Sequence, residues 1–305
     1  MKTTVDWLTF RTQTEPLNAF KALKPLFGVY APLMNLKSLE RGAMGFQQAV
    51  TVNIQKMPVA RIDFGGDSQR GWTRVAMSGK GCEWVKDWDA IGAVESLPSA
   101  QIRRLDIALT TWQGEVTHER IVDAHAAGRF GTGGRQPDLQ QITSSNPEAG
   151  RTCYIGKRTG DKFLRAYEKG FEMAAKLGPL PGKCTHIDGF KVEDIYRTEL
   201  ELKSATTELP WSVIERRDEY FAGSYPLCAD LLPGIDADVL QRRPERAPQQ
   251  DLAAALRHLK TQWGATLYTA LHAYGGDMTA VWDKVVGSHH NETLLEAGVL
   301  LVEHE

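Results

Sequence analysis

The sequence predicts an α+β protein that ends in a helical region. Two observations support this class. Short segments rich in β-branched and aromatic residues recur through residues 5–203, with helical segments between them. Beyond residue 250, apolar side chains recur at helical spacing instead. A charged, proline-interrupted stretch at 241–248 lies between these parts and is typical of a linker. We therefore expect one domain at 1–240 and a helical C-terminal region at 241–305.

The first part of the chain contains most of the predicted strands. Apolar and polar residues alternate at 51–55 and 60–64, residues 5–10 are rich in β-formers, and Gly65-Gly66 ends the strand at 60–64 with a turn. Thr117 is suited to cap the helix that follows it. The predicted strands are 5–10, 51–55, 60–64, 72–77, 102–109, 152–156, 162–167 and 195–203, and the predicted helices are 82–93, 119–127, 171–176 and 208–221.

The C-terminal region is expected to contain two helices. Asp251 is placed to cap the first, which runs to about residue 274 and ends at Gly275-Gly276. The second covers residues 278–286.

Composition limits the function classes. With 305 residues, 42% of them hydrophobic, the chain is long enough to bury a sizeable core. The net charge of −2 argues against a nucleic-acid footprint over the whole surface, but a local basic groove remains compatible with it. Four cysteines are scattered, and the N-terminus has no long apolar run, so we expect a protein of the cytoplasm without a membrane contact.

Asp106 lies in the middle of a strand-like segment, flanked by aliphatic residues. Aspartate is disfavoured in strands, so its presence needs a reason. One reading is a functional acid. The alternative is an exposed acid on an edge strand, paired with Arg104.

Two further acids share one face of another predicted strand. Glu199 and Glu201 share this face with Arg197 and Lys203, while Thr198, Leu200 and Leu202 take the opposite face. The pattern fits either a half-solvated antiparallel strand or a groove lined by acids with basic neighbours.

Tyr167 shares a strand face with Arg165 and Lys169. Two neighbouring cations would favour the phenolate, which a tyrosine nucleophile needs because a phenol ordinarily titrates near pH ~10. The alternative is a tyrosine that packs as an amphipathic aromatic.

The surrounding stretch, 151–170, is locally basic, with a net charge of +4. Such a cluster can neutralise phosphates. The candidate phosphate-binding residues are Lys157, Arg158, Lys162, Arg165 and Lys169. No P-loop, HExxH or GxSxG motif occurs, which argues against ATP hydrolysis of the P-loop kind and against those hydrolase classes.

These segments, in this order, resemble the replication initiation factor family of rolling-circle plasmid and filamentous-phage initiators. The most specific block is 152–170, Thr-Cys-Tyr-Ile-Gly-Lys-Arg-Thr-Gly-Asp-Lys-Phe-Leu-Arg-Ala-Tyr-Glu-Lys-Gly. Residues 5–8, 104–108 and 196–201 are similar to its other strands, and 65–82 is similar to the version in filamentous-phage proteins. The resemblance covers roughly 5–235 and leaves the C-terminal helices outside.

The resemblance implies a β-sheet palm with helices behind it. It also implies an enzyme that nicks one strand at a double-stranded origin, stays attached to the 5′ phosphate through tyrosine, and later recloses the circle. A tyrosyl phosphodiester keeps the bond energy, in agreement with the missing P-loop. The chain has no histidine–hydrophobic–histidine motif, which fits a family that relies on carboxylates.

By position, the resemblance makes Tyr167 the nucleophile, with Tyr154 as the alternative. Asp106 and Glu199 would hold Mg²⁺ or Mn²⁺, with Glu201 as the alternative ligand. Origin DNA and the nicked single strand are the expected partners. A host helicase, a single-strand-binding protein and a second copy of the chain are further candidates.

Two other functions remain open. One is a catalytically silent regulator that binds an origin or operator through the same fold. The other is a hydrolytic nuclease with no covalent intermediate.

Overall fold

A large antiparallel sheet organises the chain in this computed structural model, which describes residues 2–177, 184–240 and 252–291. Two units are distinguished by their internal contacts, Met1–Arg242 and Arg243–Glu305. The mixture of this sheet with helices confirms the predicted α+β class.

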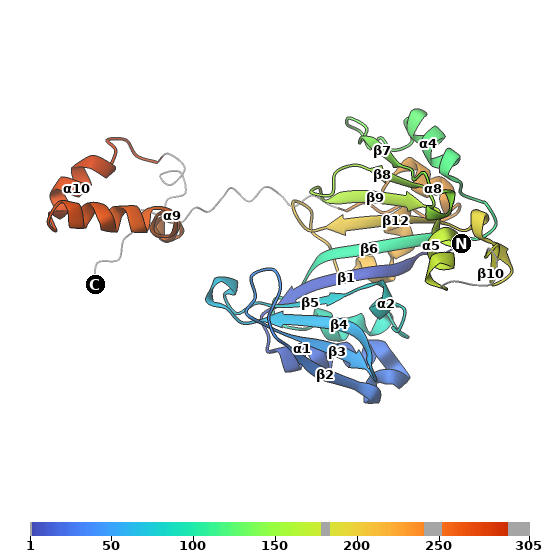
Figure 1. The fold of residues 1–305 in the computed structure, drawn as a ribbon, viewed down its shortest axis with the longest axis horizontal. Coiled ribbons are helices and arrows are strands. Elements are labelled where there is room, and N and C mark those ends of the chain that lie inside the picture. The colour runs from blue at the N-terminus through green and yellow to red at the C-terminus, as the bar shows by residue number, and fades with distance from the viewer. Residues whose placement is uncertain (1, 178–183, 241–251, 292–305) are drawn as a thin grey trace. The chain divides into compact units, whose positions relative to one another are not determined.

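The first unit contains a ten-stranded sheet with the order β2-β3-β4-β5-β1-β6-β12-β9-β8-β7 (Figure 1). A separate two-stranded sheet pairs β10 with β11. The strands are β1 (Thr4–Thr12), β2 (Met34–Leu39), β3 (Gln48–Ile54), β4 (Met57–Phe64), β5 (Thr73–Met77), β6 (Gln101–Thr111), β7 (Leu139–Ile142), β8 (Thr152–Ile155), β9 (Lys162–Tyr167), β10 (His186–Ile187), β11 (Phe190–Lys191) and β12 (Tyr196–Lys203).

The two halves of the large sheet repeat one topology. Counted outward from the centre, the first half runs β1, β5, β4, β3, β2 and the second runs β6, β12, β9, β8, β7. In each half, the first strand in the chain is central, the last lies beside it and the others follow in reverse order. A helix follows the central strand in both halves, α1 (Pro16–Leu23) after β1 and α4 (His118–Ala126) after β6. The repetition is therefore one of strand order.

Alternation along the central strands separates a buried face from a polar face. Leu8 pairs with Leu105, and Leu200 pairs with Leu164, and all four side chains are fully buried in the core. Residues that directly precede or follow these leucines along a strand, such as Asp106 after Leu105, point to the opposite face of the sheet. We call this opposite side of β1, β6, β12, β9 and β8 the polar face.

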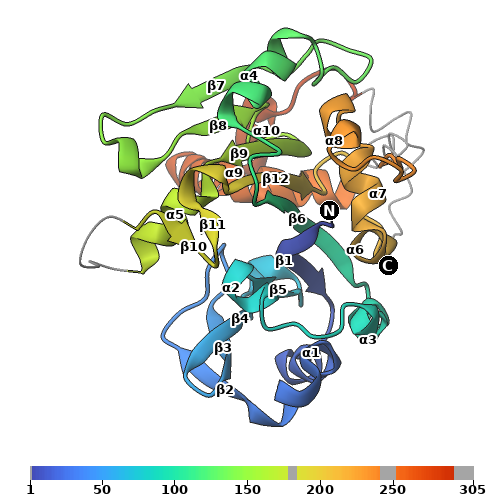
Figure 2. The ribbon, with the colours of Figure 1, turned by 90° about the vertical axis from the view of Figure 1, so that its right-hand side faces the viewer.

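Helices cover the core face of the sheet. Figures 1 and 2 show α1 and α2 beside the first half, and α4 and α8 beside the second. A Cβ atom at Gly81 would lie 1.9 Å from the Val59 carbonyl oxygen, so only glycine allows α2 to approach β4 this closely. The other α-helices of this unit are α2 (Gly79–Cys82), α3 (Gly92–Glu95), α5 (Lys169–Lys176), α6 (Ser212–Glu215), α7 (Arg217–Ala222) and α8 (Pro226–Leu231).

Local sequence signals predicted the strands better than the helices. The Thr117 cap is confirmed, since its hydroxyl accepts a hydrogen bond from the Arg120 amide at 3.1 Å. The single helix predicted at 82–93 is wrong, because α2 ends at Cys82 and a 3-10 helix at Asp89–Ile91 leads into α3 after an irregular stretch. The helix predicted at 208–221 is divided into α6 and α7 at Arg216. The predicted linker at 241–248 and the Asp251 cap lie outside the described residues.

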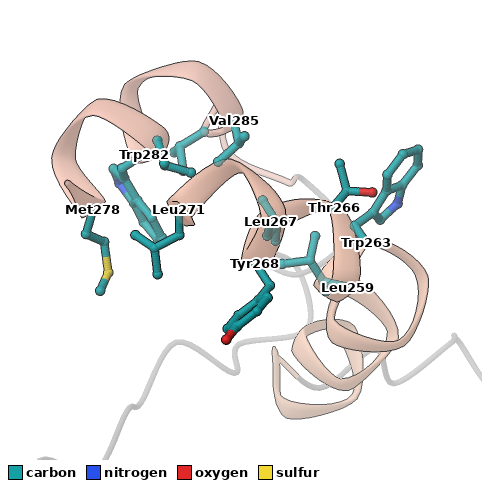
Figure 3. A pocket seen from close by; sticks show the side chains of 12 residues that line it. Leu259, Trp263, Thr266, Leu267, Tyr268, Leu271, Met278, Trp282 and Val285 are labelled. Carbon is teal, nitrogen blue, oxygen red and sulfur yellow. The ribbon is translucent and has the colours of Figure 1, made fainter. Parts of the chain in front are cut away.

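The second unit contains α9 (Leu252–Ala273) and α10 (Met278–Val285), which confirms the predicted helical C-terminal region. Gly275 and Gly276 follow α9 with positive φ angles of 61° and 87°, as helix-ending glycines do. Within this unit, Trp263, Leu271, Trp282 and other apolar residues line a cavity of about 770 Å³ (Figure 3). Among the described helices, none is both long and apolar enough to cross a membrane.

Candidate functional site

Three buried acids lie on the polar face at the centre of the sheet. Asp106 on β6 pairs directly with Glu201 on β12, whereas Glu199 pairs with Ala108 on β6 and with Arg165 on β9. Asp106, Glu199 and Glu201 are only 1%, 4% and 7% exposed. The alternative reading of Asp106, an exposed acid on an edge strand, is therefore wrong: the side chain is buried, and β6 lies between β1 and β12 at the centre of the sheet.

Arg104 joins two of these acids. Its guanidinium donates to both carboxylate oxygens of Asp106, at 2.8 and 2.6 Å, and lies 2.8 Å from Glu201. Lys203 also forms an ion pair with Glu201. The pairing of Asp106 with Arg104, which the alternative included, is therefore present, and it extends across the strands to Glu201.

Glu199 has its own cation. Arg165 Nη2 lies 2.6 Å from each oxygen of the Glu199 carboxylate. A cavity of about 30 Å³ separates the two acid–arginine groups. Its lining residues are Arg104, Arg158, Phe163, Arg165, Glu199 and Glu201.

Burial raises the pKa of Asp106 to about 6, from an ordinary value of 3.8. Arg104 lowers this pKa through its hydrogen bonds and charge, whereas Glu199 and Glu201 raise it further. Removal from water therefore outweighs the arginine.

We expect this pKa to make stability depend on pH. Between about pH 4 and about pH 6 the folded chain binds a proton at Asp106 more readily than the unfolded chain, so the stability contribution falls as pH rises. Relative to Asp106→Asn, the wild-type chain should lose ~2–3 kcal/mol of unfolding free energy across this window. Urea unfolding of both proteins at the two pH values checks this. A difference that stays constant with pH would contradict it.

Tyr167 stands near the end of β9, opposite Arg197 on β12. The Arg165 guanidinium carbon lies 5.1 Å from its ring centroid, and the Lys169 ammonium lies 5.6 Å away. The predicted position between two cations is therefore correct. Burial raises the pKa of Tyr167 above its ordinary value, and this outweighs Arg197 and Arg165, which lower the pKa as neighbouring cations are expected to do.

Tyr154 lies on β8, opposite Arg165. Its ring lies 5.3 Å from that of Phe163, and the Arg158 guanidinium stacks over both rings at 4.9 and 5.1 Å. Both candidate tyrosines are therefore close to Arg165 in the strand register. Glu199, which Arg165 binds, is the nearest of the three acids to both, whereas Asp106 lies farther along the sheet.

The structure brings some of the predicted phosphate-binding residues together and places one apart: Arg158 and Arg165 line the same cavity, Arg165 and Lys169 both lie near the Tyr167 ring, and Lys162 lies elsewhere. Lys157 and Arg158 are exposed on the turn after β8, and Arg165 lies on the polar face. Lys169 bonds Glu172 at 3.0 Å. Lys162 points elsewhere: its ammonium donates to the Ser224 carbonyl at 2.6 Å and lies 4.0 Å from the Tyr225 ring centroid.

The donors suit a divalent metal only in part. Carboxylate oxygens are ligands that Mg²⁺ and Mn²⁺ accept, and Asp106 and Glu201 face one another. In the described part of the chain, no cluster of three or more His, Cys, Asp or Glu residues is arranged to hold a metal. Arg104 is the cation that the facing pair binds here. The residues therefore fit a metal held by two carboxylates, provided that Arg104 moves away.

A fourth buried acid and a pair of tryptophans in one cavity were not predicted from the sequence. Asp63 on β4 is fully buried and bonds Arg61 at 2.7 Å and Arg74 at 2.8 Å. The arginine–aliphatic–aspartate order of 61–63 recurs at 104–106, and this repeat was the available signal. Trp7 and Trp72 line a cavity beside Arg104, and no sequence pattern placed these two residues together.

Comparisons with known proteins agree with this architecture. A solved structure, described as the rolling circle replication initiator protein from Geobacillus stearothermophilus, is similar with a TM-score of 0.55 and 21% sequence identity. The likeness covers 82% of this chain and 89% of that one, and at this identity it shows a shared fold. The search of curated proteins gives no match.

The sequence itself matches a known family, described as replication initiation factor, over residues 100–279. This stretch contains β6, β9 and β12, which carry the acids and Tyr167. It also contains α9, which the resemblance seen in the sequence left outside. Because the match covers more than half of the 305 residues, the chain belongs to the replication initiation factor family.

Proposed function

We propose that this replication initiator nicks one strand at a double-stranded origin and starts rolling-circle replication of a phage or plasmid. The observation that carries the proposal is the polar face. It gathers Tyr167, buried acids and arginines on adjacent strands within the matched part of the chain. The fold shared with a rolling circle initiator supports it further.

In the proposed reaction, the Tyr167 hydroxyl oxygen attacks the scissile phosphorus. The bond to the 3′ oxygen breaks, and that oxygen becomes the 3′ hydroxyl that primes synthesis. The 5′ phosphate stays on the tyrosine as a phosphodiester. A later attack by a 3′ hydroxyl on this bond releases tyrosine and closes the circle, so no ATP is needed.

The attack requires that Tyr167 loses its proton. Because burial raises its pKa, a neighbouring group must accept this proton. Glu199 is the nearest of the three acids, since it lies on the adjacent strand, two residues from the Tyr167 partner Arg197. Arg165, Arg197 and Lys169 surround the ring and would balance charge on the phosphate.

We propose Asp106, Glu199 and Glu201 as the candidate metal ligands. As a pair of metal ligands, the strand register favours Asp106 and Glu201, which lie opposite each other, over Asp106 and Glu199. Mg²⁺ or Mn²⁺ bound there would polarise the scissile phosphate. Lys157 and Arg158, exposed on the turn, would contact the DNA backbone.

The proposal assigns nicking and strand transfer to residues 1–240, in the cytoplasm of a bacterial host. It assigns an accessory role to residues 241–305, the region that contains α9 and α10. The apolar cavity between α9 and α10 gives this region a surface on which a second copy or a host replication protein could pack, such as a helicase or a single-strand-binding protein.

Incubation with supercoiled origin plasmid and Mg²⁺ tests the proposal. We expect nicked circles that carry covalently bound protein, visible as DNA that shifts under denaturing conditions until protease is added. A sequence-specific gel shift without nicking in any divalent metal would indicate a silent regulator. Nicking that leaves a free 5′ phosphate would indicate a hydrolytic nuclease.

A further inference from the structure

A second cavity on the polar face lies beside the acids, where β1 of the first half of the sheet meets β6 of the second. Its volume is about 470 Å³, within the range of ligand pockets. It is lined by Trp7, Thr9, Arg11, Met44, Phe46, Gln69, Trp72, Arg74, Arg103, Arg104, Lys203, Ser204 and Ala205. None of these described lining residues is acidic, and five are cations.

Two tryptophan rings in this cavity are held in place. The Arg11 guanidinium lies 4.1 Å from the Trp72 ring centroid, and Gln101 anchors Arg11 through hydrogen bonds of 3.2 and 2.9 Å. The Trp7 indole N–H donates to the Thr9 hydroxyl at 2.8 Å. Each ring is therefore fixed before any ligand arrives, which reduces the entropy lost on binding.

The cavity is connected to the acids through Arg104. This guanidinium lies 4.8 Å from the Trp7 ring centroid and also binds Asp106 and Glu201. A β-bulge brings a second arginine to the same place. Thr9 pairs with Arg104 but Phe10 pairs with Ile102, so Arg103 is the extra residue and lines the cavity beside Arg104.

We propose that this cavity binds unpaired nucleotides of the strand to be nicked, with a base stacked on Trp72 or Trp7 and phosphates near Arg11 and Arg103. Fixed aromatic rings among cations are the chemistry that recognises single strands, because every base has a flat face and every linkage a negative charge. Bases stacked within a duplex cannot reach rings that line a cavity. The inference rests on the proposed function, since it places the single strand next to the acids.

Binding of a labelled twelve-nucleotide thymidine oligonucleotide tests this, measured by fluorescence anisotropy in EDTA. Stacking contributes ~1–3 kcal/mol per base, so Trp72→Ala should weaken binding about 5- to 150-fold. Trp72→Phe should keep most of the affinity. An abasic oligonucleotide with the same phosphates should bind wild-type and Trp72→Ala proteins equally. Trp112→Ala, at a tryptophan that instead packs 5.4 Å from Phe190, is the matched control.

Three outcomes would overturn the inference. Trp72→Ala could bind the thymidine oligonucleotide as tightly as wild type. It could lose affinity equally for the abasic strand, which would indicate phosphate contact or misfolding. Wild type could also bind a duplex of the same length more tightly than the single strand. Since EDTA prevents metal-dependent nicking, failure of the nicking assay and failure of this assay can be told apart.

Discussion

Tyr167→Phe is expected to abolish covalent capture of origin DNA and to reduce nicking by about 10⁴-fold or more, as loss of a nucleophile does in other enzymes. The substitution removes one oxygen and keeps the ring, so the contacts with Arg165 and Lys169 persist. Capture is measured as protein-linked DNA after denaturation, and nicking as the rate of conversion of supercoiled plasmid.

Two other tyrosines provide the controls for this substitution. Tyr154→Phe changes the alternative nucleophile on β8 and should retain capture. Tyr268→Phe changes an exposed side chain on α9 and should behave as wild type. If Tyr154→Phe loses capture and Tyr167→Phe keeps it, Tyr154 is the nucleophile. If both keep full capture, the tyrosine mechanism is wrong.

Arg104→Met is expected to lower the free energy of unfolding by ~3–5 kcal/mol at neutral pH, because it leaves buried acids without their cation. Asp106 would lose both of its hydrogen bonds from Arg104, and Glu201 would keep only Lys203. Urea unfolding measures the change.

A second substitution separates the charge from the lost packing. Arg104→Met combined with Asp106→Asn should recover part of the stability, since the remaining buried charge is smaller. Arg135→Met is the control, because that side chain is 90% exposed and forms an ion pair with Asp138 at 3.5 Å, also at the surface. Its effect should stay within ~0.5 kcal/mol. An Arg104→Met loss below ~1 kcal/mol would show that the ion pairs contribute little.

The strands were predictable because alternation is a local signal. The segments predicted at 102–109, 162–167 and 195–203 form β6, β9 and β12 with small shifts at their ends. Helix α1 was missed, because Pro16 begins it without a capping hydrogen bond from Glu15. Likewise, a single helix was expected where Arg216 divides α6 from α7.

The arrangement of the site could be predicted only in outline. Alternation indicated that Glu199 and Glu201 share a face, but it could not show which of them faces Asp106, because register depends on pairing between distant strands. The bulge at Arg103 and the strand order that places β1 beside β6 are equally non-local. The same applies to the pKa of Tyr167, which depends on burial by the whole fold.

Mass spectrometry of the DNA-linked peptide tests the central claim most directly. After nicking and nuclease digestion, trypsin separates the two candidates, because it cuts beside Arg151, Lys157, Arg165 and Lys169. Tyr167 falls in the peptide 166–169 and Tyr154 in the peptide 152–157. We predict a nucleotide remnant on 166–169, attached to Tyr167. A remnant on 152–157, or nicked DNA with no linked peptide, would contradict the account.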